Sequence, residues 1–163
     1  MEKPFDQLAG VISSTSGYTG GDYANPTYEV VGSGRSGHVE AVKIVYDPAR
    51  VTYAQLLETY WKQVDPFDGD GQFCDQGGTY IPEIFVSNPS EQAAAEASKQ
   101  RVAAQFPGQT IAVRIVAAKT FWDAEDYHQD YYLKNPLRYS YYRNGCGRDA
   151  RLRAVWGIPA APH

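Results

Sequence analysis

The sequence predicts an α+β fold, specifically a ferredoxin-like two-layer sandwich in which helices cover one face of a mixed sheet. Segments with strand patterning alternate with segments of helical periodicity, in the order strand, loop, strand, helix, loop, strand, helix, strand. Their spacings and loops suit a mixed or antiparallel sheet better than a doubly wound parallel one. The order completes a two-fold βαβ arrangement only if another strand precedes Met1, so we expect the first strand of the fold to be missing.

The first part of the chain predicts a short helix, a strand, a long loop and a second strand. Residues 2–8 have apolar side chains three apart, and Gly10 follows them, which is typical of a short helix and its end. A β-rich strand is expected over residues 11–18. Residues 17–38 are dense in Gly, Ser and Asn-Pro, and a loop of this length is usually functional. Residues 39–47 are largely apolar and β-branched, so we expect a central strand there.

The middle of the chain predicts two helices around a loop and a strand. Thr52 can cap a helix over residues 53–64, whose apolar stripe would pack on the sheet. Residues 65–80 form a second loop, rich in Asp and Gly, and residues 81–87 predict a strand. A long helix is expected to open at Asn88-Pro89-Ser90 and to continue to residue 106.

The last part of the chain predicts one more strand, over residues 109–116, and a helix over residues 123–134 that carries a face of tyrosines. After Asn135-Pro136 we expect an irregular, basic tail.

Composition limits the possible functions. The chain has 163 residues, 43% of them hydrophobic and 13% aromatic, which predicts one domain over residues 1–163 with a substantial core. A net charge of −4 without a basic cluster argues against a nucleic-acid partner. The apolar runs are too short to span a membrane and none forms a signal peptide, so we expect no membrane partner and a cytoplasmic location. Two cysteines and three histidines have no zinc-site spacing, so neither a metal nor a cofactor is expected.

Five segments resemble the A-type peptide methionine sulfoxide reductases. They are GYTGGDYANPTYEVVGSGRSGHVEAV, VYDP, LLETYWKQVDP, GQFCDQGGTYIPEIF and AEDYHQDYYLKNP, and together they extend over nearly the whole chain. The resemblance implies reduction of methionine-S-sulfoxide, in oxidised proteins or as the free amino acid, with thioredoxin as the reductant. It implies a role in protein repair under oxidative stress.

One family motif is absent. In the family, the cysteine of a GCFW motif attacks the sulfoxide sulfur, and its Phe-Trp pair encloses the methyl group. The family glutamate that follows this motif matches Glu2, so the nucleophile would lie just upstream of Met1. We expect an N-terminally truncated domain that is inactive alone; a paralogue that has lost its thiol is the alternative. A non-catalytic module that binds methionine sulfoxide, or an interaction domain with relic site residues, would have the same sequence pattern.

The resemblance also assigns roles to four polar residues. Reduction of a sulfoxide needs a thiolate at sulfur and an acid at oxygen, and Glu40 matches the family's general acid. Tyr28 and Tyr80 match the tyrosines that hold the sulfoxide oxygen, and Asp75 matches the aspartate that orients water and the thiolate. Without the resemblance, these residues would be interpreted as a surface glutamate, two strand-edge tyrosines and a turn aspartate.

The cysteines and histidines are less specific. Cys146 matches the position of a resolving thiol, in a Gly-flanked segment near the C-terminus; a free surface cysteine is the alternative. Cys74 is either a substitute nucleophile or a small loop residue, and the neighbouring Asp75 would raise its thiol pKa. For His38 and His128, we expect hydrogen-bonding roles in the scaffold.

Overall fold

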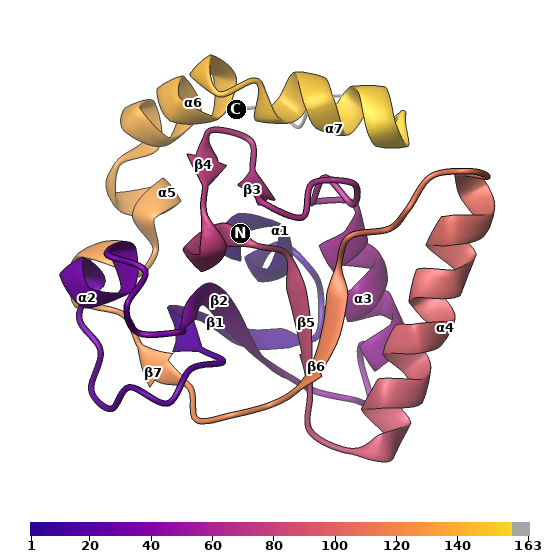
Figure 1. Cartoon of the computed structure of the whole chain (residues 1–163), viewed down its shortest axis with the longest axis horizontal. Helices are drawn as coiled ribbons and strands as arrows, with labels where there is room; N and C mark the ends of the chain where they lie inside the picture. The colour runs from indigo at the N-terminus through magenta and orange to yellow at the C-terminus, as the bar shows by residue number, and fades with distance from the viewer. Residues whose placement is uncertain (158–163) are drawn as a thin grey trace.

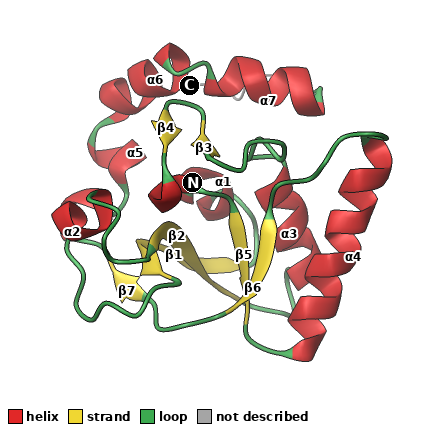
Figure 2. Ribbon diagram, in the orientation of Figure 1, coloured by secondary structure: helices red, strands yellow, loops and turns green. Residues whose placement is uncertain are grey.

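The computed structural model describes residues 1–157 of the chain. Figure 1 shows the elements in chain order and Figure 2 separates helices from strands. The helices are α1 (Glu2–Asp6), α2 (Tyr28–Gly32), α3 (Tyr53–Trp61), α4 (Pro89–Gln105), α5 (Tyr131–Lys134), α6 (Pro136–Gly145) and α7 (Arg148–Trp156), with short 3₁₀ turns η1 (Gly78–Tyr80) and η2 (Asp126–His128). The strands are β1 (Val11–Thr19), β2 (Val39–Tyr46), β3 (Gly71–Gln72), β4 (Asp75–Gln76), β5 (Glu83–Val86), β6 (Arg114–Ala117) and β7 (Trp122–Asp123).

The strands of the described chain form three separate sheets. β2, β1 and β7 make an antiparallel sheet in that order, β3 and β4 form a small hairpin, and β5 pairs with β6 in parallel. The α+β class is therefore confirmed, whereas the ferredoxin-like sandwich stays a prediction. β2 was expected at the centre of a sheet and lies at an edge, with Val45 43% exposed. Its β-branched residues suit an edge strand with one wet face as well as a central strand.

The helix starts at α3 and α4 follow the sequence signals closely. Thr52 and Gln55 form a reciprocal capping box: the Thr52 hydroxyl accepts from the Gln55 amide at 3.1 Å, and the Gln55 side chain accepts from the Thr52 amide at 2.8 Å. At α4, the Asn88 side chain accepts from the Glu91 amide at 2.8 Å, and Pro89 occupies the first turn. Both predicted N-termini are confirmed.

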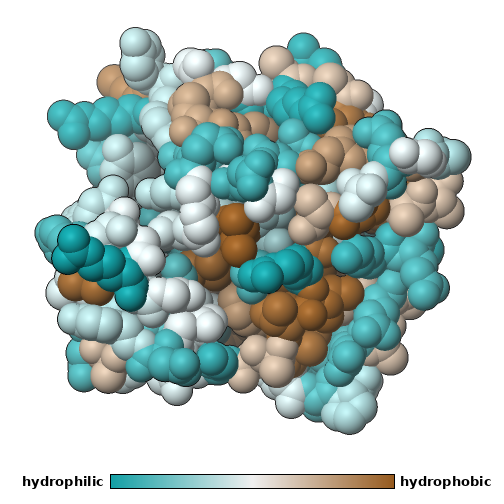
Figure 3. All heavy atoms as spheres, viewed as in Figure 1, coloured by the Kyte–Doolittle hydropathy of each residue, from teal (hydrophilic) through white to brown (hydrophobic). Residues whose placement is uncertain are grey.

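The main core lies between α3, α4 and the β5–β6 sheet (Figure 1). Trp61 is 3% exposed there, and its indole Nε1 donates to the hydroxyl of Ser98 at 2.9 Å. A smaller cluster of Phe5, Val51 and Leu56 joins α1 to α3. Apolar residues also come to the surface over β5 and β6, where Figure 3 shows the brown area of this face.

Several local predictions are wrong or incomplete. The loop over residues 17–38 contains α2, and the loop over residues 65–80 contains β3, β4 and η1. The strand expected over residues 109–116 begins later, at Arg114. No continuous helix spans residues 123–134, because Glu125 is extended and Asp130 takes a left-handed backbone (φ 52°), which splits the segment into β7, η2 and α5.

The tail after Asn135 is helical, which corrects the expectation of an irregular segment. Pro136 starts α6 at the first helical position, where its missing amide hydrogen costs nothing, instead of ending a helix. α6 and α7 follow, and they run over the β3–β4 hairpin in Figure 1. Residues 158–163 of the predicted tail lie outside the described residues. Within residues 1–157, no helix is long and apolar enough to cross a membrane.

Candidate functional site

Four residues from separate segments line one open cavity of about 890 Å³. Tyr28 begins α2, Glu40 lies in β2, Asp75 begins β4 and Tyr80 ends η1. The fold thus brings together the four polar residues that the sequence singled out. Cys146, the fifth, is outside the described lining of the cavity.

Glu40 has the most perturbed carboxyl group of the cavity. It stands opposite Tyr18 in the β1–β2 ladder. The residue as a whole is exposed because the cavity is open, but protein atoms crowd its carboxyl group. This burial, followed by the negative charge of Asp75, raises the pKa of Glu40 to about 7, while a charged amino group at Met1 acts in the opposite direction. A carboxyl group that is partly protonated at neutral pH can donate a proton.

The two tyrosines are positioned by a link between their segments. The buried hydroxyl of Thr79 donates to the carbonyl oxygen of Val31 at 3.0 Å, which ties the η1 turn before Tyr80 to the α2 helix that begins with Tyr28. Burial and the charge of Glu40 raise the pKa of Tyr80 to about 12. Tyr80 therefore stays a neutral hydrogen-bond donor at physiological pH.

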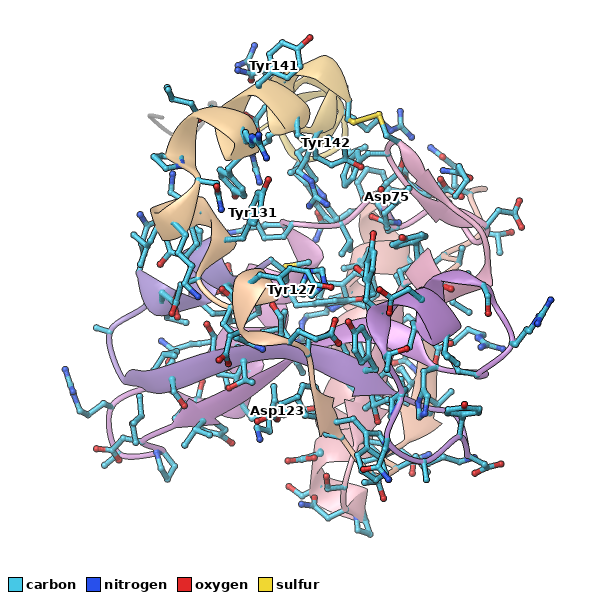
Figure 4. All side chains as sticks on the ribbon, turned by 90° about the vertical axis from the view of Figure 1, so that its left-hand side faces the viewer. Asp75, Asp123, Tyr127, Tyr131, Tyr141 and Tyr142 are labelled. Atoms are coloured by element: carbon cyan, nitrogen blue, oxygen red, sulfur yellow. A yellow bond between two sulfur atoms is a disulfide. The ribbon has the colours of Figure 1, made fainter. Side chains whose placement is uncertain are left out.

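Asp75 is held by a residue that the sequence did not single out. The phenol of Tyr142, on α6, donates a hydrogen bond to the Asp75 carboxylate, and Figure 4 shows the two residues near each other. Both line the cavity, and we call this side of it, formed by α6 and the β3–β4 hairpin, its roof. Burial, then Asp75, raises the pKa of Tyr142 above its ordinary value. Tyr142 was missed because its segment was expected to be irregular. Its only sequence signal is the tyrosine-rich tail.

The amino group of Met1 is a second unexpected group of the cavity. It is buried near Glu40, and burial, followed by the charge of Arg148, lowers its pKa to about 5. The charge of this amino group lowers the pKa of Glu40, but burial and the charge of Asp75 outweigh it.

The histidines have contacts of a structural kind. His38 is 3% exposed; its Nδ1 accepts from the Gly21 amide at 3.1 Å, so its Nε2 is left to donate to the Tyr23 carbonyl oxygen at 2.7 Å. These bonds shape the loop before β2. His128 packs its ring against Tyr28, with centroids 4.8 Å apart, at the cavity wall.

The two cysteines form a disulfide across 72 residues of sequence, with their Cα atoms 5.2 Å apart. Cys74 comes from the turn between β3 and β4, and Cys146 from the end of α6. No free cysteine exists among the described residues. Cys146 is therefore neither unpaired nor in a loose segment, and Cys74 offers no thiol as a substitute nucleophile in this state.

One acidic cluster could in principle hold a cation, because carboxylate oxygens of Glu2, Asp6 and Asp130 lie within 4.8 Å of one another. The Glu2 carboxylate already accepts from the Ser16 hydroxyl at 2.7 Å and from the Asp130 amide at 2.8 Å. Hydrogen bonds thus account for this cluster, and it carries no metal assignment.

A second cavity of about 620 Å³ lies between the β1–β2 and β5–β6 sheets. Apolar side chains of both sheets and of α3 line it, among them Val42, Ile44, Leu57 and Ile84. Glu40 and Met1 border both cavities.

Comparison with known proteins places this geometry in context. A family described as peptide methionine sulfoxide reductase matches residues 1–159. The chain is 49% identical over 157 residues to peptide methionine sulfoxide reductase MsrA 2 of Caulobacter vibrioides, a match that covers 96% of this chain and 80% of that protein. It is 47% identical over 158 residues to the MsrA of Bacillus licheniformis, with 96% and 87% covered.

Solved structures with the same fold superpose on this chain. Methionine sulfoxide reductase A of Corynebacterium diphtheriae superposes with a TM-score of 0.72 at 34% identity, covering 83% of this chain and 69% of that one. Reduced Mxr1 of Saccharomyces cerevisiae superposes with a TM-score of 0.77 at 26% identity, covering 83% and 79%.

Proposed function

We propose that this chain, which belongs to the peptide methionine sulfoxide reductase family, reduces methionine-S-sulfoxide in oxidised proteins and in free form to methionine. The observation that carries the proposal is a single cavity in which Glu40, with a pKa of about 7, meets Tyr28, Asp75 and Tyr80. The activity would repair proteins after oxidative stress, with thioredoxin as the reductant, and we assign it to the cytoplasm.

In the proposed reaction, a thiolate attacks the sulfoxide sulfur while Glu40 gives its proton to the oxygen. The oxygen ends on the attacking sulfur as a sulfenic acid, and the substrate leaves as a thioether, so one sulfur is oxidised as the other is reduced. Tyr28 and Tyr80 donate hydrogen bonds to the oxygen as negative charge develops on it. Asp75 orients water and the thiolate, and the charge of its carboxylate keeps Glu40 protonated. Cys146 would later resolve the sulfenic acid as a disulfide.

The attacking thiol is assigned to a segment before Met1, so that residues 1–163 form a truncated domain that does not turn over alone. One observation supports this assignment. Apolar side chains of the β1–β2 and β5–β6 sheets and of α3 line the cavity between the two sheets, a surface that a further strand would cover.

Adding a GCFW-containing strand before Met1 tests the proposal. The extended protein should reduce N-acetyl-methionine-S-sulfoxide with a dithiol reductant, followed by chromatography of the product, whereas the chain as given should show only background. In the extended protein, Glu40→Gln should slow reduction by roughly 10²–10⁴-fold. Glu58→Gln, on the exposed side of α3, is the matched control and should keep the full rate. An extended protein that is folded and inactive would refute the proposed activity.

A binding module without catalysis is the second candidate, because both cysteines are engaged with each other while the cavity is intact. Titration calorimetry with N-acetyl-methionine-S-sulfoxide distinguishes the two. Binding by the extended protein without product supports the module, and turnover excludes it.

A further inference from the structure

Three consecutive residues of the β3–β4 hairpin each contact the segment from Tyr142 to Arg148. β3 ends at Gln72 and β4 begins at Asp75, so Phe73 and Cys74 form the two-residue turn between them. The guanidinium of Arg148 lies 4.2 Å from the centroid of the Phe73 ring, Cys74 is bonded to Cys146, and Asp75 accepts from Tyr142.

The backbone of the hairpin is tightly constrained at this turn. Phe73 has a left-handed backbone (φ 56°), which residues other than glycine adopt rarely. Two residues before Phe73, Gly71 could not carry a Cβ atom, because the atom would overlap the backbone of Asp75 and Gln76. The hairpin therefore closes tightly, and its tip meets the junction between α6 and α7.

α6 and α7 differ in how they are attached to the domain. α7 buries Leu152, its Trp156 donates to the Val64 carbonyl oxygen at 3.0 Å, and Arg151 pairs with Asp65 at 2.7 Å. α6 has no buried residue, and its Leu137 and Tyr141 are 86% and 82% exposed; Figure 4 shows Tyr141 pointing away from the domain. The attachment of α6 to the domain therefore depends more on its contacts with the hairpin than the attachment of α7 does.

The two cysteines of the disulfide also differ in how exposed each residue is. Cys74 is exposed, whereas Cys146 is half-buried, so an incoming thiolate reaches Cys74 more easily. Arg148, two residues after Cys146, lies over the ring of Phe73 and donates to the Gln63 carbonyl oxygen, 3.3 Å away, and the charges of Arg143, Asp75 and Asp149 also act on it. Burial lowers the pKa of Arg148 to about 10, so the side chain is still charged at neutral pH. A nearby cation stabilises a departing thiolate, whereas the carboxylate of Asp75 disfavours one at Cys74.

We propose that the Cys74–Cys146 disulfide is a latch that a dithiol protein opens by attack on Cys74, with Cys146 as the leaving thiolate. A thiolate of the reductant forms a bond to the Cys74 sulfur, the Cys74–Cys146 bond breaks, and Cys146 departs with the electron pair and takes up a proton. The second thiol of the reductant then displaces Cys74. Two cysteines are reduced, and the dithiol becomes a disulfide.

Opening the latch would release α6 from the hairpin and leave α7 attached. Tyr142 and Asp75 both line the cavity, so its roof would loosen as Cys146 becomes a free thiol. This consequence rests on the proposed function, in which Cys146 acts as a thiol. The latch itself does not, and it can be tested without any sulfoxide.

The first test traps the exchange. A thioredoxin whose second cysteine is replaced by serine is incubated with the oxidised chain, and the mixed disulfide is mapped by mass spectrometry of peptides. We expect the adduct on Cys74 to exceed that on Cys146 by at least about tenfold. Arg148→Gln should slow adduct formation by roughly threefold or more, and Arg153→Gln, exposed on α7, should not. An adduct mainly on Cys146, or no adduct, would overturn the direction of attack.

The second test follows the helices by hydrogen exchange. After reduction, amides of α6 should exchange at least roughly tenfold faster, and those of α7 should change by less than about twofold. Cys74→Ser and Cys146→Ser should each reproduce this pattern without reductant, and Asn144→Ala, exposed on α6, should not. Reduction of the wild-type chain keeps the test valid if a variant does not fold. Unchanged exchange in α6 would refute the latch, whatever the activity of the extended protein.

Discussion

Replacing Glu40 by Gln should change how the stability of the domain depends on pH. Burial and the charge of Asp75 raise the pKa of Glu40 from 4.5 to about 7 in the folded protein. Between these pH values the folded chain binds more protons than the unfolded chain, so the free energy of unfolding falls as pH rises. The contribution of the protonated Glu40 to the free energy of unfolding is fully present below pH 4.5, and it is lost as the pH rises through about 7. A glutamine does not ionise, so in the Glu40→Gln variant this fall in the free energy of unfolding is absent.

The size of the effect follows from the pKa. A pKa higher by about 2.5 corresponds to about 3 kcal/mol, because a tenfold change in an equilibrium constant is worth roughly 1.4 kcal/mol. Solvent reaches the open side of the cavity and screens the carboxylate, so the measured value should be smaller, about 1 kcal/mol. The wild-type protein should therefore lose about 1 kcal/mol more than Glu40→Gln between acidic and slightly alkaline pH.

The assay is urea unfolding at a series of pH values, monitored by circular dichroism with the disulfide intact. If the free energy of unfolding falls with urea concentration at the same slope in both proteins, their values extrapolated to water can be compared. Glu58→Gln removes an exposed carboxylate that pairs with Lys62 on α3, and its pH dependence should follow the wild type. If the difference between wild type and Glu40→Gln is flat with pH, the carboxyl group of Glu40 has an ordinary pKa, and the proposed acid loses its basis.

Three further substitutions test the scaffold that carries the site. Thr52→Ala removes the capping box of α3 and should lower stability by about 1 kcal/mol in urea unfolding, while Thr52→Ser should restore it. Ser98→Ala leaves the buried indole of Trp61 without its acceptor and should cost roughly 1–3 kcal/mol, measured by the same unfolding. Gly17→Ala places a methyl group against both the ring of Phe121 and the backbone oxygen of Trp122 in β7 and should cost about 1–3 kcal/mol; unchanged stability would show that β7 can move away from β1 at this point.

The helices that the sequence predicts well are those whose signals are local. Thr52 and Asn88 cap their helices through side-chain bonds to amides three residues later, and such bonds depend on sequence spacing alone. α3 also buries Leu56, Leu57 and Trp61 on one face, which produces a readable period.

The C-terminal region escaped prediction for the opposite reason. α6 buries no residue and α7 buries only Leu152, so neither helix has an apolar stripe that a periodicity argument could detect. Pro136 is equally compatible with the end of one helix and the start of another. Asp130 interrupts the expected helix with a left-handed backbone, and its amide donates to Glu2 of α1 at 2.8 Å, a contact between residues far apart in sequence that local signals do not reveal.

The candidate site shows a similar division. Glu40, Tyr28, Asp75 and Tyr80 were assigned by motif resemblance, and their meeting in one cavity could not follow from spacing within the chain. The contacts that hold them join residues far apart in sequence, such as the Asp75–Tyr142 hydrogen bond across 67 positions. Because the tail was expected to be irregular, the sequence did not indicate that Tyr142 contacts Asp75.

These contacts also place the proposed acid on a different part of the scaffold from the disulfide. Glu40 lies on a strand that is bonded to β1 along its whole length, so its position is independent of the cysteines. The opposite wall depends on α6, which has no buried residue and meets the hairpin at Asp75 and Cys74. In the proposed latch, reduction of the disulfide moves the roof without moving Glu40, the proposed proton donor. Asp75 links the two parts, because it lies in the roof and its charge raises the pKa of Glu40. If opening the roof moves Asp75 away, the pKa of Glu40 should fall, and its carboxyl group should ionise at lower pH.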